Sequence, residues 1–143
     1  MTNNIKRVEQ EDDAGCGIAC VAIVTGKTYR QGKSFFLERV FLPTDRKPHT
    51  RHYQLRRALR KLGVATEKRL FRKWREIETL SIVPINRRSD TCWHWVVFVP
   101  NGEKPYILDP APGKGRQRYD FRGMKARGFY IAILGSRNFQ GVV

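Results

Sequence analysis

Three residues of the chain have the types and the order that acyl-transfer chemistry needs: Cys16, His94 and Asp109. A thiolate attacks a carbonyl carbon, an imidazole moves the proton to the leaving group, and a carboxylate fixes the imidazole tautomer. Each residue also has a structural alternative. A free cysteine is usually buried, a strand histidine can be a hydrogen-bonded core residue, and Asp-Pro is common in turns. Together the three predict a nucleophile, a base and an orienting group.

Cys16 follows Gly15 and precedes Gly17, at the predicted start of a helix. The N-terminus of a helix presents free N–H groups and the positive end of the helix dipole, which favour a thiolate. We expect the two glycines to permit close approach of a substrate backbone. Gln10, six residues earlier, has an amide that can donate to a developing oxyanion together with the backbone N–H of Cys16.

The elements that must position these residues begin with helices. Residues 15–25 predict a buried helix that Gly26 ends, and residues 29–42 predict a less regular one. Residues 50–62 predict the clearest helix, because apolar residues recur there at helical spacing and Gly63 follows. The apolar positions of this third helix are Tyr53, Leu55, Ala58, Leu59 and Leu62.

Strand patterns follow the helical ones. A turn at Asn101-Gly102 predicts a hairpin of residues 93–99 and 106–108, which can place Asp109 on the same side of the sheet as His94. The spacing of fifteen residues leaves the register open. Pro84 predicts an edge strand or an irregular end. Helices followed by strands indicate a single α+β domain over residues 1–143, with N-terminal helices packed on a mostly antiparallel sheet. The candidate strands are residues 64–71, 80–85, 93–99, 106–108 and 128–134.

The motifs that carry a resemblance are, in chain order, Gln10, Gly15 to Cys20, His94 to Val97 and Leu108 to Pro110. This set resembles papain-like cysteine peptidases. Within them it is most similar to the bacteriocin-processing family, whose domains usually precede peptide-exporting ABC transporters and cut leader peptides after a double glycine. The resemblance covers residues 8–113. It implies a papain-like fold with Cys16 as nucleophile, His94 as base, Asp109 as orienting residue and Gln10 as oxyanion-hole donor.

The chain departs from that family in three respects. Gly15 stands where an acidic residue is common, no transporter domain follows, and the chain is unusually basic. We therefore expect a stand-alone cysteine peptidase acting on a peptide or protein. A related thiol hydrolase, such as a deamidase or an isopeptidase, uses the same groups and stays open.

The charge of the chain is the second functional signal. Lys and Arg number 28 against 13 Asp and Glu, a formal net charge of +15, which favours an anionic partner. Phe71 and Trp74 lie between basic residues and predict stacking on bases. The alternative functions are a papain-like scaffold that binds nucleic acid, as a nuclease or toxin effector, and an inactive binding module. The candidate anion-binding residues are Arg56, Arg57, Arg60, Lys61, Arg69, Arg72, Lys73 and Arg75.

Other candidate sites are weaker. Cys20, four residues after Cys16, fits a small buried helix residue better than a redox partner. A zinc site of Cys92, His94, His49 and His52 has no CxxC or HExxH spacing, so we expect neither a metal nor another cofactor. The chain has three cysteines, no secretory signal and no membrane-spanning stretch, which predicts a soluble cytoplasmic protein.

Overall fold

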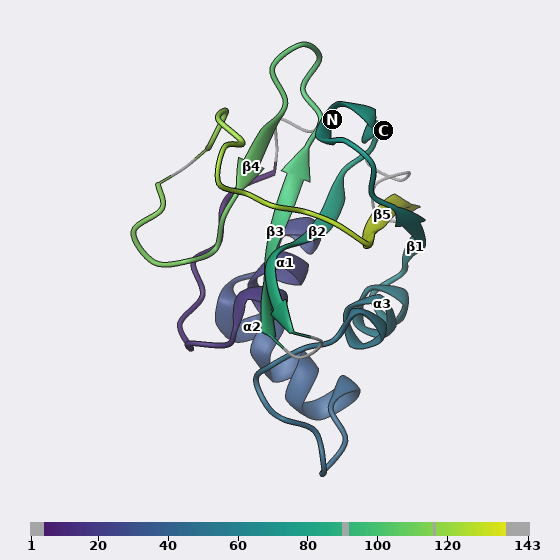
Figure 1. Ribbon diagram of the computed structural model, residues 1–143. Coiled ribbons are helices and arrows are strands. Elements are labelled where there is room, and N and C mark those ends of the chain that lie inside the picture. Colours follow the sequence, from purple (N-terminus) through teal and green to yellow (C-terminus); the bar gives the residue numbers. More distant parts are fainter. Residues whose placement is uncertain (1–4, 90–91, 116, 137–143) are drawn as a thin grey trace.

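A computed structural model describes residues 5–89, 92–115 and 117–136, with only the backbone of Ser89, Cys92 and Ser136. Three helices and a five-stranded sheet make up the fold (Figure 1). The helices are α1 (Cys16–Thr25), α2 (Tyr29–Phe35), which the π-helical turn η2 (Phe36–Val40) continues, and α3 (His52–Lys61). The strands are β1 (Val64–Leu70), β2 (Ser81–Ser89), β3 (Cys92–Val99), β4 (Tyr106–Leu108) and β5 (Phe129–Ser136).

Helix α1 is the buried helix predicted from its small and apolar residues. It packs against α2, α3 and β3, and every residue from Cys16 to Val24 is buried. Gly26 ends the helix in the left-handed conformation, with φ of 71°, which a glycine adopts without steric cost. The burial of α1 fixes the position of its first residue relative to the sheet.

Helix α3 is amphipathic, as its spacing predicts. Leu55, Ala58 and Leu59 are buried. Tyr53 departs from the prediction, because 46% of it is exposed and Gln54 is buried in its place. The Gln54 side chain accepts a hydrogen bond from the backbone N–H of Arg51 at 2.6 Å, so a polar residue is satisfied inside the helix start.

The sheet is entirely antiparallel, with the strand order β1-β5-β2-β3-β4. The predicted hairpin is present as β3 and β4, in which Val97 pairs with Leu108. Of the two alternatives that Pro84 indicated, the edge strand was wrong, because the last strand, β5, inserts between β1 and β2 and leaves β2 in the interior. The irregular end is confirmed, because the pairing of β2 with β3 shifts register between Ile85 and Ser89. Pro84 is tolerated in the interior because β5 pairs only with Ser81 and Ile82, before the proline.

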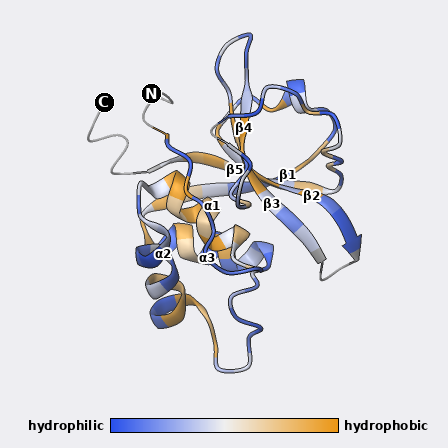
Figure 2. Ribbon diagram, turned by 90° about the vertical axis from the view of Figure 1, so that its left-hand side faces the viewer, coloured by the Kyte–Doolittle hydropathy of each residue, from blue (hydrophilic) through white to orange (hydrophobic). Residues whose placement is uncertain are grey.

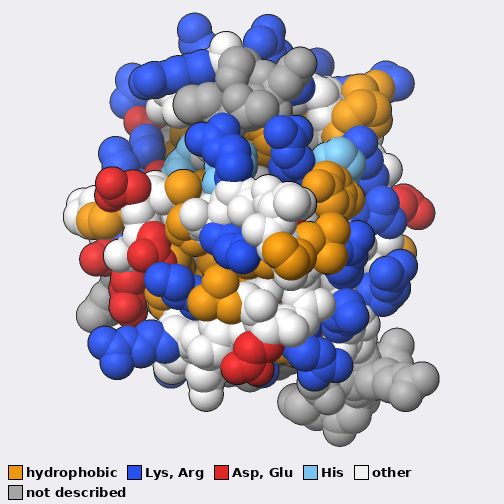
Figure 3. Space-filling model, turned by 90° about the horizontal axis from the view of Figure 1, so that it is seen from below, with side chains coloured by type: hydrophobic (Ala, Val, Ile, Leu, Met, Phe, Trp, Pro, Cys, Tyr) orange, Lys and Arg blue, Asp and Glu red, His pale blue; other side chains and the backbone are white. Residues whose placement is uncertain are grey.

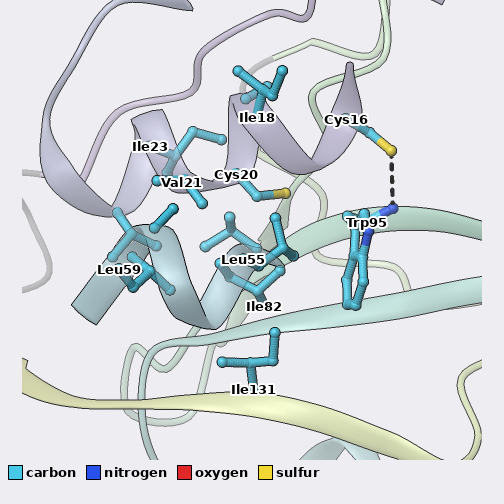
Figure 4. Packing of buried hydrophobic residues seen from close by; sticks show 14 of the residues in the cluster. Cys16, Ile18, Cys20, Val21, Ile23, Leu55, Leu59, Ile82, Trp95 and Ile131 are labelled. Carbon is cyan, nitrogen blue, oxygen red and sulfur yellow. Dashed lines mark hydrogen bonds between the residues drawn. The ribbon is translucent and has the colours of Figure 1, made fainter. Parts of the chain in front are cut away.

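Apolar side chains fill both faces of the sheet. The larger cluster lies between the sheet and the helices, where Ile18 and Val21 of α1 meet Leu55 of α3 and Ile82 and Ile131 of the strands (Figures 2 and 4). The smaller cluster covers the opposite face and includes Val83, Val96 and Phe98. In the described part of the chain, no helix has the length and apolar character needed to cross a membrane.

Candidate active site

Cys16 is the first residue of α1, and its sulfur faces β3. The backbone N–H of Trp95 donates to Cys16 Sγ across 3.4 Å (Figure 4). Strand β4 ends at Leu108, which pairs with Val97 of β3. Trp95 therefore has no partner in β4, and its N–H is available to the sulfur. Among the described residues, no side chain caps α1 and its first turn has no acidic residue. The helix dipole and the Trp95 N–H therefore both favour negative charge on this sulfur.

The glycines beside Cys16 have a different role from the predicted one. A Cβ at Gly15 would overlap the hydroxyl of Tyr29, and a Cβ at Gly17 would overlap Oγ1 of Thr50. Both positions are therefore filled by the protein itself and not left open to a substrate. The glycines allow α1 to approach α2 and the segment before α3 closely enough to bring Cys16 to the sheet.

The predicted hairpin brings His94 and Asp109 together, in a register that their spacing in the sequence left open. His94 Nε2 lies 2.6 Å from Asp109 Oδ1. Continuing the register beyond Leu108 places Asp109 opposite Val96, and residues two apart on one strand share a face. Asp109 and His94 consequently lie on one side of the sheet, at the end of β3 that β4 leaves uncovered.

Electrostatics favour a charged imidazole and a charged carboxylate in this pair. Burial alone would lower the pKa of His94, but hydrogen bonding to Asp109 and Cys16 and their negative charges raise this pKa to about 9. Burial would raise the pKa of Asp109, yet the hydrogen bond with His94 and another from the N–H of Ala111 at 2.9 Å lower it. At neutral pH the pair is an imidazolium and a carboxylate.

An N-terminal segment that the sequence analysis did not single out holds the Asp109 loop. Arg7 Nε donates to the backbone carbonyl of Asp109 at 2.7 Å, and the same guanidinium donates to the carbonyl of Ala111. The backbone N–H of Gln10 donates to the carbonyl of Pro110 at 2.8 Å. Three consecutive carbonyls are thus bound by one segment. Nothing in the sequence distinguishes Arg7 from the other basic residues, because its partners are backbone atoms about a hundred residues away.

Gln10 is buried close to the start of α1. Its Nε2 donates to the carbonyls of Asp12 and Asp13 at 2.9 and 3.0 Å, and its Oε1 is buried with no partner among the described residues. In this arrangement both amide protons hold the loop that leads into α1. Donation to an oxyanion requires the amide to release one of these carbonyls.

The same loop is fixed from its outer side by Asp12. Its carboxylate accepts a hydrogen bond from the Tyr29 hydroxyl at 2.7 Å and pairs with Lys33 at 3.0 Å. The hydrogen bond from Tyr29, followed by the one from Lys33, lowers the pKa of Asp12. Residues 10–13 are therefore anchored both to α2 and, through Gln10, to the Asp109 loop.

The remaining cysteines and histidines do not form a metal centre in the described part of the chain, where no group of three or more His, Cys, Asp or Glu lies close enough. Cys20 is fully buried, as predicted, and burial raises the pKa of its thiol well above the ordinary range, followed by the charges of Cys16 and Asp109. His49 packs edge-on against Trp93. The side chain of Cys92 lies outside the described residues.

The predicted basic cluster is divided by the structure. Arg56, Arg57 and Arg60 line one hollow beside α3, of about 530 Å³. The other members lie elsewhere on the surface: Arg69 pairs with Glu67 at 2.6 Å, and Arg72, Lys73, Arg75 and Lys61 are exposed. Phe71 and Trp74 do not stand free for stacking on bases, because they pack on each other and on the smaller core cluster.

A second hollow, of about 460 Å³, opens directly beside the His94–Asp109 pair. His94, Asp109 and Trp93 line it, with Ile85 and Met124 supplying apolar walls. Its size is within the range of ligand sites in proteins. The imidazole is therefore accessible from this side of the sheet to a chain lying in the hollow. The basic residues on its wall are Arg88, Lys114, Arg118 and Arg122.

Solved structures with a similar fold include peptidase domains. The peptidase domain of Streptococcus ComA, a bifunctional ABC transporter in a quorum-sensing pathway, aligns with a TM-score of 0.63 and 22% identity over 91% of this chain and 98% of that one. A double-glycine-motif protease from an AMS/PCAT transporter, solved with its leader peptide, aligns with a TM-score of 0.60 and 17% identity over the same shares. The peptidase domain of Streptococcus mutans ComA gives 0.60 and 20%, over 91% and 99%.

No family model and no curated protein matches the sequence. The comparisons therefore concern the fold. They confirm the expected papain-like α+β architecture and its resemblance to bacteriocin-processing peptidase domains.

Proposed function

We propose that this chain is a cysteine peptidase that cuts a peptide or protein substrate through Cys16, His94 and Asp109. The observation that supports it most is the His94 Nε2–Asp109 Oδ1 contact of 2.6 Å, beside Cys16, whose sulfur accepts from the backbone N–H of Trp95, the residue next to His94. With Nε2 bound to the carboxylate, Nδ1 is the ring nitrogen left for the thiol. A nucleophile, a base and an orienting carboxylate in this order are the parts of a thiol acyl-transfer site.

The chemistry follows from the charge states. The Cys16 thiolate attacks the scissile carbonyl carbon, and the C=O electron pair moves to oxygen to give a tetrahedral oxyanion. The His94 imidazolium donates its proton to the leaving nitrogen as the C–N bond breaks, which leaves a thioester on Cys16. Neutral His94 then takes a proton from water, whose oxygen attacks the thioester, and the thiolate leaves from the second intermediate as the carboxylic acid product forms.

The oxyanion needs donors near the start of α1. The backbone N–H of Cys16 belongs to the first turn, whose N–H groups have no partner within the helix. Gln10 is the second donor in this proposal, and it acts once substrate binding draws its amide away from a carbonyl of the Asp12–Asp13 loop. Until then the amide of Gln10 keeps that loop in place.

A peptide is the substrate class that the comparisons favour, since the neighbours of this fold are peptidase domains and one was solved with a leader peptide. The nucleic-acid alternative has less support. The basic residues predicted for it are split between separate surfaces, and the two aromatic residues are taken up by the core.

The test is cleavage of a peptide library prepared from a whole proteome, with new N-termini mapped by mass spectrometry. We expect the 143-residue chain to produce new termini and the Cys16→Ala variant, with its fold verified by circular dichroism, to produce none. Cys20→Ala is the matched control, because Cys20 is buried one helical turn away. Equal cleavage by wild type and Cys16→Ala, or none by either, would refute the proposal.

A further inference from the structure

Trp93 and Trp95 of β3 line a third hollow, of about 380 Å³, that the proposed chemistry does not use. It adjoins the reacting groups, because Trp95 donates its backbone N–H to Cys16 and Trp93 also lines the hollow beside His94. Among the described residues, its charged lining consists of cations alone. These cations are Arg51, Lys68, Arg87 and Arg127.

Two of these cations lie against aromatic rings that also line the hollow. Lys68 Nζ lies 4.6 Å from the centroid of the Phe129 ring, and the Arg87 guanidinium lies 5.9 Å from that of Trp93. No described ion pair includes Arg51, Lys68 or Arg127. Lys68, placed against a ring face, keeps its charge available to an incoming anion and loses little side-chain freedom on binding it.

The basic lining continues along α3. The hollow lined by Arg56, Arg57 and Arg60 shares His52 and Tyr53 with the hollow beside Trp93 and Trp95. The two hollows therefore form one basic track. Helix α3 has ten residues, and the track therefore extends for about 15 Å beside it. Burial lowers the pKa of His52, and the charges of Lys68, Arg56 and Arg51 lower it further. The histidine therefore stays neutral inside a positive field.

The surface view shows an uneven charge distribution. On the face seen in Figure 3, Lys and Arg side chains dominate the top and the right-hand side, whereas on the left they are mixed with most of the acidic side chains. The acidic side chains near the candidate active site are already engaged: Asp12 pairs with Lys33, and Asp109 is bound to His94.

We propose that the substrate carries an acidic segment, rich in Asp or Glu, that binds this basic track beside the scissile bond. The inference rests on the proposed peptidase function and adds the substrate class. Carboxylates of an extended or helical peptide would pair with Lys68, Arg51 and Arg127, and its apolar groups would cover the half-exposed rings of Tyr53 and Phe129. An acidic peptide is favoured over nucleic acid because the track borders Trp95, whose backbone N–H is bound to the sulfur of Cys16, the group proposed to attack a peptide bond.

The first arm of the test measures binding without chemistry. The Cys16→Ala chain is titrated into fluorescein-labelled peptides of fifteen residues, one rich in Glu, one rich in Lys and one of Gly and Ser, with anisotropy as the readout. We expect binding of the Glu-rich peptide alone, weakened by added salt. The variant Lys68→Glu with Arg127→Glu should raise its Kd by about tenfold or more. Arg72→Glu with Lys73→Glu makes the same charge change away from the track and should change the Kd less than twofold.

Urea unfolding followed by tryptophan fluorescence shows whether each double variant keeps its fold. If Lys68→Glu with Arg127→Glu does not fold, Lys68→Gln with Arg127→Gln takes its place. Equal loss in the two charge-reversal pairs would overturn the proposal, because attraction would then reflect net charge alone. Tighter binding of a fifteen-nucleotide single-stranded RNA, lost in the Lys68 and Arg127 variant, would also overturn it and assign the track to nucleic acid.

The second arm uses the peptide library with the active chain. Enrichment of Asp and Glu on one side of the cut, reduced in the Lys68→Glu and Arg127→Glu variant, supports the proposal. Cuts without such enrichment overturn it and leave the peptidase function standing. An absence of cuts refutes the peptidase function, and the binding arm then still decides whether the track takes an acidic peptide.

Discussion

The backbone N–H of Trp95 donates to the sulfur of Cys16 across 3.4 Å, which joins the first residue of α1 to the residue that follows His94 in β3. One hydrogen bond thus sets the distance between the helix that carries the thiol and the strand that carries the imidazole. It exists because β4 is only three residues long and leaves this part of β3 unpaired on one side. The helix dipole and this N–H act on the same sulfur atom.

The environment of Cys16 predicts selective alkylation of its sulfur. At neutral pH, iodoacetamide should modify Cys16 at least about tenfold faster than Cys20, which is fully buried and has a raised pKa. Peptide mapping by mass spectrometry at timed intervals measures both rates. In His94→Ala the rate at Cys16 should fall. Equal rates at Cys16 and Cys20 in the wild type would contradict the prediction.

The Asp109 carboxylate predicts a large effect of a small substitution. Asp109→Asn keeps the shape of the side chain but removes the charge that raises the pKa of His94. We expect kcat/KM on a peptide selected from the library to fall by about 10²- to 10⁴-fold, with little change in KM. Asp120→Asn, an exposed carboxylate paired with Arg122, is the control and should leave kcat/KM unchanged. An active Asp109→Asn enzyme would exclude the orienting role.

The raised pKa of His94 predicts how stability depends on pH. The folded chain keeps the proton until about pH 9, whereas an unfolded histidine loses it near its ordinary pKa of 6.5. The stabilisation is complete below pH 6.5 and is lost as pH rises through 9. Urea unfolding should show the free energy of unfolding falling across this window, by on the order of 1–3 kcal/mol.

His94→Gln should remove most of this slope. His52→Gln is the matched control, because the pKa of His52 is lowered and its imidazole is neutral in both states above pH 6.5. A wild-type slope that persists in His94→Gln would show that another group is responsible.

The sequence predicts those features that depend on local patterns. Small apolar residues followed by Gly26 predict α1, and the turn at Asn101-Gly102 predicts the hairpin that brings Asp109 to His94. Both depend on residues within about fifteen positions of each other. The order of Gln10, Cys16, His94 and Asp109 adds the resemblance to a peptidase fold, which the structural comparisons confirm.

Features set by distant partners escape the sequence. The place of β2 depends on β5, which pairs with it from fifty residues away, so Pro84 indicates the irregular end of β2 but not its interior position in the sheet. Likewise, Arg7 binds carbonyl groups of the Asp109 loop, and backbone atoms leave no pattern of residue types. The Tyr29 hydroxyl fills the space beside Gly15 because α1 packs on α2, and local composition does not reveal this contact.

Arg7 is predicted to be a positioning residue for Asp109. Arg7→Ala removes donors to the carbonyls of Asp109 and Ala111 and should lower the free energy of unfolding by about 1–3 kcal/mol. Because the carboxylate then loses its fixed place, NMR titration should show the pKa of His94 falling from about 9 toward 6.5. Arg7→Lys should retain part of the free energy of unfolding and part of the raised pKa of His94.

Arg30→Ala is the control for Arg7. Its side chain is 89% exposed and pairs with Glu11 at 3.7 Å, so its loss should cost less than about 0.5 kcal/mol and leave the pKa of His94 unchanged. If Arg7→Ala lowers stability but leaves the pKa of His94 unchanged, the residue is structural and does not position Asp109.

The close approach of Gly17 to Thr50 predicts a coupled pair. A Cβ at Gly17 would overlap Oγ1 of Thr50, a side chain that is 1% exposed, so Gly17→Ala should lower the free energy of unfolding by about 1–3 kcal/mol. Thr50→Ala removes Oγ1, the atom that overlaps most, and leaves the backbone carbonyl that accepts from Trp95 Nε1. In the double variant Gly17→Ala with Thr50→Ala, part of the lost stability should return, a coupling of about 0.5–2 kcal/mol in a double-mutant cycle. Additive effects would show that Gly17 serves the conformation of α1 or the approach of substrate, as first expected from the sequence, and not the contact with Thr50.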